Sequence, residues 1–294
     1  MEFTRQHYNC SLCSKNDTRP LLEKQGFSIV QCTKCGFVYV NPRLPDEQLA
    51  AIYQHNYFHN RDYGYTDYEQ EKRLRIKNFD KWFGDAAVFL PAVETVQALD
   101  VGCAAGYGLD VMKSRGWQAE GLELDEEVFE RLRQNGYQVY RHHLENFSPG
   151  HRYHLISLFD VIEHIPQADA AFSRLHELLE EGGIVVMVTP DHNSLQRKIT
   201  GRRWFQYKPI EHIQYFTKET LAAFASRNGL EIVHAKRSGQ YADGQFLLNR
   251  LKYYRFPFLY SFFRKLFSLF GLLNRTFYTD TGSLFLILKK MKKG

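Results

Sequence analysis

Two Glu-His pairs in the sequence carry side chains that can exchange protons, Glu163-His164 and Glu211-His212. An imidazole titrates close to neutral pH, and a neighbouring carboxylate raises its basicity, so either pair could take a proton from a hydroxyl or a carbon acid. A structural role stays open for both pairs. Glu211-His212 could serve only as hydrogen-bonding residues, and Glu163-His164 could cap the helix expected after Pro166.

Four of the five cysteines lie near the start of the chain as two C-x2-C pairs, Cys10/Cys13 and Cys32/Cys35. Each pair turns tightly enough to bring two thiolates to one ion, and two pairs complete a closed tetrahedral zinc site of the structural type. Disulfides are the alternative. They are disfavoured because the chain begins without a secretory signal and is expected to be cytoplasmic. We therefore expect residues 1–42 to form a zinc ribbon whose folding depends on its metal.

Residues 99–108, LDVGCAAGYG, form a glycine-rich turn after an apolar, strand-like segment. A loop for a nucleoside triphosphate would need a Lys-Ser/Thr pair after its last glycine, but Leu109 and Asp110 follow Gly108. A nicotinamide dinucleotide loop would need G-x-G-x-x-G, and Ala104 stands where the second glycine should allow close approach of a pyrophosphate. The turn therefore favours a ligand that presents no phosphate to it.

S-adenosylmethionine is such a ligand, because it presents an ammonium, a carboxylate and a ribose diol. Asp100, at the end of the strand-like segment, can face the ammonium directly or through a water molecule. Glu123, seventeen residues beyond Gly106, ends the next strand-like segment, and its carboxylate can accept hydrogen bonds from both ribose hydroxyls. The two acids and the turn together predict a site for this cofactor.

The elements that must position these residues alternate between strand and helix from residue 96 onward. The expected strands are 96–101, 118–124, 137–140, 153–162, 184–190, 230–238 and 283–290, and the expected helices are 107–116, 125–136, 170–183 and 217–229. This alternation predicts an α/β fold with a parallel sheet and a site at the carboxyl ends of its strands. With 294 residues, 44% of them apolar, the chain is expected to form one large domain, residues 93–294, and a smaller appendage.

Over roughly residues 93–240, and again at the final strand, the sequence resembles the class I S-adenosylmethionine-dependent methyltransferases. The resemblance rests on LDVGCAAGYG, GLELD, FDVIEHI and GGIVVMVTP, and it implies a Rossmann-like seven-stranded sheet with helices on both faces. It implies that the methionine end is bound by Asp100, Gly102 and Gly106, the ribose by Glu123 with Leu124 beside it, the adenine by Leu144 and Glu145, and the sulfonium by Phe159 and Asp160. Ala104 departs from the family pattern, since many members have glycine at that position.

The ribbon joined to this domain is similar to a narrower group, which includes sugar C-methyltransferases and uncharacterised bacterial enzymes of polysaccharide and natural-product pathways. The sugar C-methyltransferases carry a Glu-His pair before a similar Tyr-Phe segment, which implies a base role for Glu211 and His212. The other pair makes His164 a further catalytic candidate. Asp160, Glu163 and His164 also resemble a segment of quinone O-methyltransferases, and the alternative this implies is a divalent ion held by these three residues.

Residues 43–92 are expected to form a helical connector or lid. Five tyrosines fall within sixteen residues of it: Tyr53, Tyr57, Tyr63, Tyr65 and Tyr68. Their rings could pack between the two domains, or their hydroxyls could cover a ligand. Both interpretations stay open.

Between the last two expected strands lies an insert, residues 239–281, that is both apolar and basic. Its residues 244–279 include six basic residues, twelve aromatic residues and no acidic residue. After Pro257, a helical arrangement would place the polar residues on one narrow stripe: Ser261, Arg264, Lys265, Ser268 and Arg275. So wide an apolar face predicts docking on an anionic membrane through residues 245–278. A homodimer interface or a hydrophobic lid over a soluble substrate stays open.

These features predict an S-adenosylmethionine-dependent methyltransferase that lies in the cytoplasm, peripheral on the inner face of the membrane. Its expected acceptor is a hydroxyl or carbon of a small or lipid-linked glycan or natural-product intermediate. The alternatives are a sugar-nucleotide C-methyltransferase with a soluble substrate and a catalytically silent scaffold. The net charge of +5 does not argue for a nucleic-acid partner, and no apolar run is long enough to span a membrane.

Overall fold

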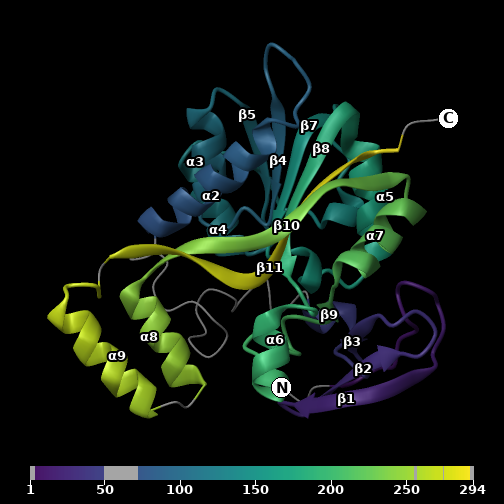
Figure 1. Ribbon diagram of the computed structural model, residues 1–294. Helices are drawn as coiled ribbons and strands as arrows, with labels where there is room; N and C mark the ends of the chain where they lie inside the picture. Colours follow the sequence, from purple (N-terminus) through teal and green to yellow (C-terminus); the bar gives the residue numbers. More distant parts are fainter. Residues whose placement is uncertain (1–3, 50–71, 255–256, 274, 292–294) are drawn as a thin grey trace.

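A seven-stranded sheet forms the centre of the molecule (Figure 1). The computed structural model describes residues 4–49, 72–254, 257–273 and 275–291. The strands of the sheet are, in chain order, β4 (Gln97–Val101), β5 (Gln118–Leu122), β6 (Gln138–Tyr140), β7 (Tyr153–Phe159), β8 (Leu179–Pro190), β10 (Leu230–Asp243) and β11 (Thr276–Lys290). They lie side by side in the order β6-β5-β4-β7-β8-β11-β10. The five strands β4, β5, β6, β7 and β8 are parallel, and β11 is antiparallel to both of its neighbours, β8 and β10.

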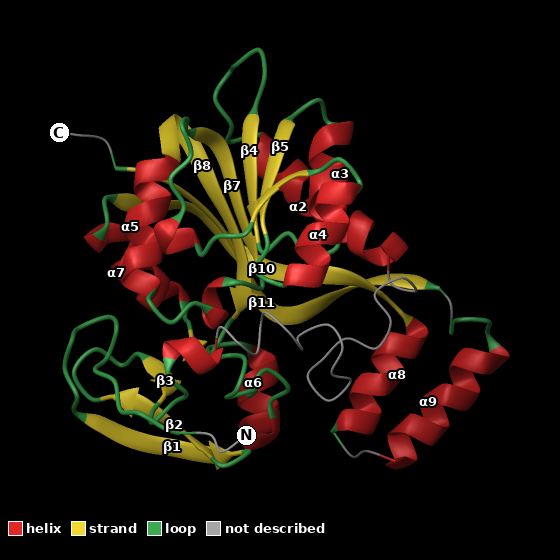
Figure 2. Ribbon diagram, turned by 180° about the vertical axis from the view of Figure 1, so that it is seen from behind, coloured by secondary structure: helices red, strands yellow, loops and turns green. Residues whose placement is uncertain are grey.

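Helices cover both faces of this sheet, as Figures 1 and 2 show, so the predicted α/β fold is confirmed. One face carries α2 (Lys72–Ala87), α3 (Tyr107–Ser114) and α4 (Glu126–Gln134), and the other carries α5 (Ala168–Leu178) and α7 (Lys218–Arg227). Each layer buries an apolar stripe against the sheet, which gives one core on each face. Because the order along the sheet reverses between β4 and β7, the loops after these strands diverge and leave a crevice at their carboxyl ends.

Short polar motifs fix where individual helices begin. The Asp125 carboxylate accepts a hydrogen bond of 3.0 Å from the Val128 backbone N–H and so caps α4. Thr217 and Thr220 form a reciprocal capping box at the start of α7. The helix α5 begins after Gln167, so Glu163-His164 do not cap it, and that alternative is wrong. These two residues lie instead in a 3₁₀ turn, η2 (Ile162–His164).

The amino-terminal residues form a smaller four-stranded antiparallel sheet, in the order β1-β2-β3-β9. Its first three strands are β1 (Thr18–Lys24), β2 (Phe27–Cys32) and β3 (Val38–Val40), of which β2 and β3 pair as an antiparallel hairpin. Its fourth strand, β9 (Gln214–Tyr215), comes from the segment between β8 and α7 of the larger domain. The ring of Phe37 also lies 5.4 Å from the rings of Phe216 and Phe224. The small sheet therefore shares strands and core with the larger domain.

The insert is shorter than expected, because its flanking strands extend into it. Strands β10 and β11 continue as a two-stranded ribbon that pairs Gly239 with Asp280 and Asp243 with Thr276. Beyond this ribbon lie α8 (Gly244–Tyr253) and α9 (Pro257–Leu269). In Figures 1 and 2 these helices and the small sheet lie below the same end of the central sheet, on opposite sides. Within the described parts of the chain, no helix is long and apolar enough to cross a membrane.

The helix α9 exposes a narrower apolar surface than the sequence predicted. Phe258, Phe262 and Leu269 are exposed at 81%, 54% and 78%, whereas Phe263 and Phe267 are half-buried. The exposed polar residues Ser261, Arg264, Lys265 and Ser268 lie next to the apolar three on the helix. The expected fifth polar residue, Arg275, is not part of the stripe, because α9 ends at Leu269.

The remaining described elements are short. They are the helix α6 (Leu195–Thr200) and two 3₁₀ turns, η1 (Leu144–Asn146) and η3 (Gly201–Arg203). The five tyrosines from Tyr53 to Tyr68, on which the expectation of a lid rested, lie outside the described residues.

Candidate active site and metal centre

A cavity of about 1060 Å³ opens at the carboxyl ends of the parallel strands. Its wall includes the loops after β4, β5 and β6, the helix α8 and the loop that precedes β9. Of the predicted site residues, those on its wall are Gly102, Glu123, Leu124, Leu144, Glu145, Phe159, Asp160, His164 and His212. The crevice predicted from the strand pattern thus brings together residues from segments far apart in the chain.

The glycine-rich turn lies between β4 and α3 in left-handed backbone conformations. Gly102 has φ +71°, and a Cβ there would come within 2.8 Å of the Val161 side chain. Gly106 has φ +81° at the N-cap of α3. Ala104 also lies in this region, with φ +48°, which explains why glycine is the easier residue at that position. The turn brings backbone rather than side chains to the wall of the cavity.

Asp100, the acidic residue of β4, lies behind this turn and not on the cavity wall. Its exposed fraction is 2%. Its carboxylate accepts a hydrogen bond of 2.6 Å from Ser157 Oγ on β7, a partner that the sequence analysis missed. A Cβ at Gly108 would collide with the same carboxylate, so Gly108 makes room for it. Burial raises the pKa of Asp100 to about 7, and the charge of Glu123 adds to the shift.

Glu123 follows β5 and joins two loops of the cavity wall. Its carboxylate accepts hydrogen bonds from three backbone N–H groups: Leu124 at 2.7 Å, Asp125 at 2.8 Å and Ala104 at 2.9 Å. Burial raises the pKa of Glu123 to about 6, although the N–H donors oppose the shift. The side chain is thus fixed at the edge of the crevice, where a ligand that brings hydroxyl donors would meet it.

An aromatic group from α2 forms a wall that the sequence analysis did not identify. The Phe159 ring lies 4.9 Å from the ring of Trp82 and 5.6 Å from that of Phe79, and all three line the cavity. The spacing of Phe79, Trp82 and Phe83 on one face of a helix was a signal that could have predicted this contact. An aromatic, apolar wall of this kind suits the desolvated part of a ligand.

Asp160 follows Phe159 and also has a left-handed backbone, with φ +54°. Burial raises its pKa to about 6, and the positive charges of Arg75 and Lys208 oppose the shift. The Asp160 carboxylate lines the cavity and can stabilise a positively charged group close by, although the two cations offset part of this attraction.

The two Glu-His pairs meet on this wall. The His164 and His212 rings lie 4.8 Å apart in an edge-to-face arrangement, and His164 Nδ1 is 2.9 Å from the backbone oxygen of Glu211. The carboxylates bind other side chains: Glu163 accepts a 2.9 Å hydrogen bond from Thr189 Oγ1, and Glu211 pairs with Lys208 at 3.3 Å. Among the described residues, no hydrogen bond joins the carboxylate to the imidazole within either pair, although the Glu163 carboxylate lies close to both rings.

Both imidazoles are neutral at neutral pH. Burial lowers the pKa of His164 to about 4 and that of His212 well below its usual range, and the charge of Lys208 adds to both shifts. Within the described chain, His212 Nδ1 is buried without a hydrogen-bond partner. A neutral imidazole with an open ring nitrogen can accept a proton. Donor atoms of Glu163, His164 and His212 lie within 4.8 Å of one another, which is close enough for these three residues to hold a cation. The cation site considered from the sequence consisted of Glu163 and His164 with Asp160 in place of His212.

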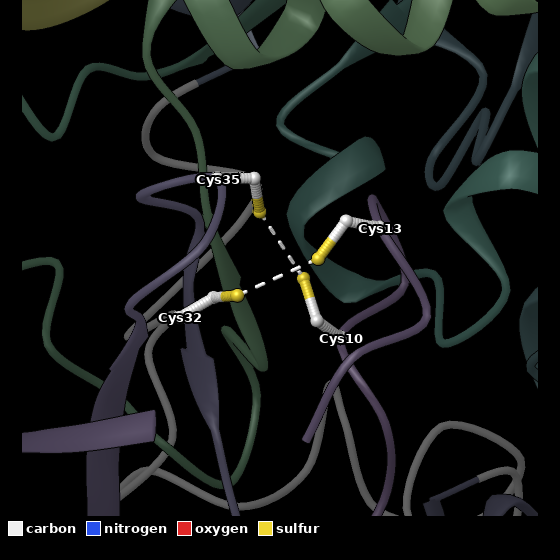
Figure 3. Close-up of side chains that lie close together, drawn as sticks. All are labelled: Cys10, Cys13, Cys32 and Cys35. Carbon is white, nitrogen blue, oxygen red and sulfur yellow. Dashed lines mark hydrogen bonds between the residues drawn. The ribbon is translucent and has the colours of Figure 1, made fainter. Parts of the chain in front are cut away.

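The four amino-terminal cysteines converge on one point, as Figure 3 shows. Cys10 Sγ lies 3.5 Å from Cys35 Sγ, and Cys13 Sγ lies 3.5 Å from Cys32 Sγ. All four sulfur atoms lie within 4.8 Å of one another, and none forms a disulfide. Zinc–sulfur bonds of about 2.3 Å in a tetrahedron place sulfur atoms about 3.8 Å apart, so the donor set fits a tetrahedral metal ion.

Comparisons with known proteins agree with this geometry. A family model described as a methyltransferase domain matches residues 73–235. A solved S-adenosylmethionine-dependent methyltransferase from Clostridium acetobutylicum is similar to this chain with 12% sequence identity and a TM-score of 0.51, and the match covers 76% of this chain and 96% of that one. Among curated proteins, none matches this sequence.

Two further solved structures have lower scores. Magnesium protoporphyrin IX methyltransferase from Synechocystis, with bound S-adenosylhomocysteine, shares 16% identity over 77% of this chain and 89% of that one, with a TM-score of 0.46. The YcgJ protein from Bacillus subtilis shares 13% identity over 73% of this chain and 99% of that one, with a TM-score of 0.49. Because the family model spans more than half of the sequence, the chain belongs to the methyltransferase-domain family, and its sheet has the fold of the class I S-adenosylmethionine-dependent methyltransferases.

Proposed function

We propose that this chain transfers the methyl group of S-adenosylmethionine to a hydroxyl or carbon of a lipid-linked acceptor at a membrane surface. The observation that carries the proposal is the position of α9. This helix exposes apolar and cationic side chains and packs on α8, whose residues Phe246 and Arg250 line the same cavity as Glu123 and His212.

Acidic residues on the cavity wall support the placement of the cofactor. Glu123 would accept hydrogen bonds from the ribose hydroxyls, and Leu144 and Glu145 would flank the adenine. Asp160 would face the positively charged end of the molecule, and the turn at Gly102 would let it lie against backbone. Asp100 would hold the turn from behind and reach the ligand only through a water molecule or a shift of the turn.

The histidines support a role in proton transfer. When bound, S-adenosylmethionine supplies an electrophilic methyl group on a sulfonium. His212, held neutral by burial, would accept the proton that the acceptor loses at its attacking hydroxyl or carbon. His164 packs edge-to-face on His212 and bonds the Glu211 backbone oxygen, and in this way it would orient the base. Alignment in a closed pocket would contribute much of the rate.

The exposed surface of α9 supports membrane docking. Phe258, Phe262 and Leu269 could enter the lipid interface while Arg264 and Lys265 reach anionic head groups. Positions 244–279 contain no acidic residue, which favours an anionic membrane over a basic or neutral partner on this surface. Docking would bring the cavity mouth to the membrane and give a lipid-linked acceptor a direct route to His212.

The cysteine cluster supports a structural zinc ion. It would hold β3, whose Val38 pairs with Tyr215 of β9, three residues after His212. Val40 N also donates to the Ile213 backbone oxygen at 2.9 Å. Zinc bound by Cys10, Cys13, Cys32 and Cys35 would thus stabilise the segment that carries the proposed base.

The test of membrane docking is co-sedimentation with vesicles of phosphatidylcholine that contain phosphatidylglycerol. The double variant Phe258→Glu/Phe262→Glu should lose more than tenfold in partitioning, because two apolar anchors become acidic and each phenylalanine contributes about 1.5–3 kcal/mol on burial. Val88→Glu is the matched control, since Val88 is 79% exposed and follows α2, remote from α9 in the chain. Unchanged partitioning of the double variant would refute docking through α9.

The same preparation distinguishes the alternatives. Sedimentation velocity without vesicles should give a monomer for both the parent protein and the double variant. A parent dimer that the double variant dissolves, with no binding to vesicles, would show that α9 is a homodimer interface. Methylation of a nucleotide-linked sugar in solution, unaffected by the double variant, would favour a sugar-nucleotide C-methyltransferase.

A further inference from the structure

Two buried side chains beside the cavity, Glu163 and His212, each have one polar atom that is not paired. Glu163 is 2% exposed and His212 is 5% exposed. The Thr189 hydroxyl donates a hydrogen bond of 2.9 Å to one carboxylate oxygen of Glu163, Oε2. Over the described chain, neither the other oxygen, Glu163 Oε1, nor His212 Nδ1 has a hydrogen-bond partner. Burying unpaired polar atoms is unfavourable, so two of them together indicate a place where a ligand would bind.

These two atoms belong to a group of three possible metal donors, of which His164 is the third. Donor atoms of Glu163, His164 and His212 all lie within 4.8 Å of one another. Backbone oxygens of Glu211 and Asp160 orient the His164 ring, and a bound ion would replace one of these contacts. Both histidines line the cavity, so an ion that enters the cavity can reach the group.

The donor atoms suit a divalent transition metal ion. Imidazole nitrogens bind zinc, cobalt and iron, whereas magnesium and calcium prefer sites built from oxygen atoms. Metal–ligand bonds of about 2.1 Å in a tetrahedron place donor atoms about 3.4 Å apart, so the three side chains would have to move closer by little more than about 1 Å. The charge of Lys208 opposes a cation at Glu163, but Lys208 is paired with Glu211 at 3.3 Å, and the charge of Asp160 acts in the opposite sense.

We propose that Glu163, His164 and His212 form a second metal site, apart from the four cysteines, for a divalent transition ion such as Co²⁺ or Zn²⁺. With three protein ligands in place of four thiolates, the site would bind its ion more weakly than the cysteine cluster and lose it on dialysis. Its effect on catalysis rests on the proposed function. An ion on His212 Nδ1 would occupy the nitrogen that the proposed base offers to a proton, so the bound ion would inhibit methyl transfer.

Titration of the zinc-loaded, dialysed full chain with Co²⁺, followed by absorption spectroscopy, tests the site. Zinc keeps the cysteine cluster filled, because it binds more tightly than cobalt. One Co²⁺ per chain should then bind with visible d–d bands and without a thiolate-to-cobalt charge-transfer band. Glu163→Gln and His212→Gln should each weaken this binding by at least about tenfold, since each removes a ligand. His143→Gln is the matched control, a histidine of the same cavity wall outside the group.

Circular dichroism checks that the variants are folded, and the parent protein alone is already decisive. Cobalt binding that Glu163→Gln and His212→Gln lose and His143→Gln keeps supports the site. No cobalt bound to the parent protein, cobalt bound only with a thiolate band, or equal binding in all four proteins overturns it. The first of these results would mean that Glu163 and His212 pair through a shared proton or a water molecule.

S-adenosylhomocysteine is titrated into the same zinc-loaded preparation by calorimetry. Its failure to bind would refute the proposed function, and the cobalt titration would still decide the metal site. Its normal binding to a parent protein that binds no cobalt would refute the metal site alone.

Discussion

Replacing Phe37 with alanine should destabilise the whole molecule, because the ring belongs to a core that the small sheet and the larger domain share. Phe37 follows the second cysteine pair and is fully buried. Its ring lies 5.4 Å from the rings of Phe216 and Phe224 and 6.0 Å from that of Tyr39. Removing a buried phenylalanine ring costs about 3–5 kcal/mol, since the apolar burial is lost and a cavity stays behind. Phe258→Ala is the matched control, because that ring is 81% exposed and should change stability by less than about 0.5 kcal/mol.

Urea denaturation of the metal-loaded protein, followed by tryptophan fluorescence and by circular dichroism, measures this cost. Trp204 packs in a cluster with ribbon residues such as Ile29, whereas Trp82 packs in the core of the larger domain. The fluorescence and circular dichroism signals should change in one transition. Phe37→Ala should move its midpoint to a lower urea concentration and leave the dependence of the unfolding free energy on urea unchanged. A separate early transition in the parent protein, with the main transition unaffected by Phe37→Ala, would refute the shared core.

Three further predictions test the sites. Burial raises the pKa of Asp100 to about 7 from an ordinary value of 3.8, so between these pH values the folded state binds more protons than the unfolded state. The free energy of unfolding, measured in urea, should therefore fall by up to about 1.4 kcal/mol per pH unit from pH 4 to 7. Asp100→Asn should make this fall less steep, and an unchanged dependence on pH would contradict the prediction. Cys13→Ser should abolish bound zinc, measured by mass spectrometry of metals, and lower the melting temperature, while Cys103→Ser, outside the cluster, should leave the metal content unchanged. His212→Gln should lower kcat by about 10²–10⁴ and leave the affinity for S-adenosylhomocysteine unchanged; a kcat equal to that of the parent protein would exclude the base role.

The central sheet was predictable because its signals are local. Strands such as β4 and β7 are short apolar runs between turn residues, and α3 and α4 between them show helical periodicity. The positions of Asp100 and Glu123 follow from the same pattern, since parallel strands end at one edge of a sheet. The four cysteines were equally local, because two C-x2-C turns bring the thiolates into range.

Contacts between distant segments were not predictable in this way. The pairing of Val38 with Tyr215 joins strands of three and two residues, too short to leave any periodic signal. Phe79 and Trp82 reach Phe159 through the packing of α2 on the sheet, which a helical pattern alone does not orient. Likewise, the charge of Lys208 affects the pKa of Lys24 because β1 belongs to a sheet whose fourth strand, β9, comes from the larger domain.

The central claim is that the crevice at the carboxyl ends of β4 and β5 holds the cofactor, with Glu123 bound to its ribose. Calorimetric titration with S-adenosylhomocysteine tests it most directly. The parent protein and Glu130→Gln, a control at an exposed acid of α4, should bind one molecule per chain, and Glu123→Gln should bind at least about tenfold more weakly. No binding by the folded parent protein, or equal affinity in Glu123→Gln, would contradict the account.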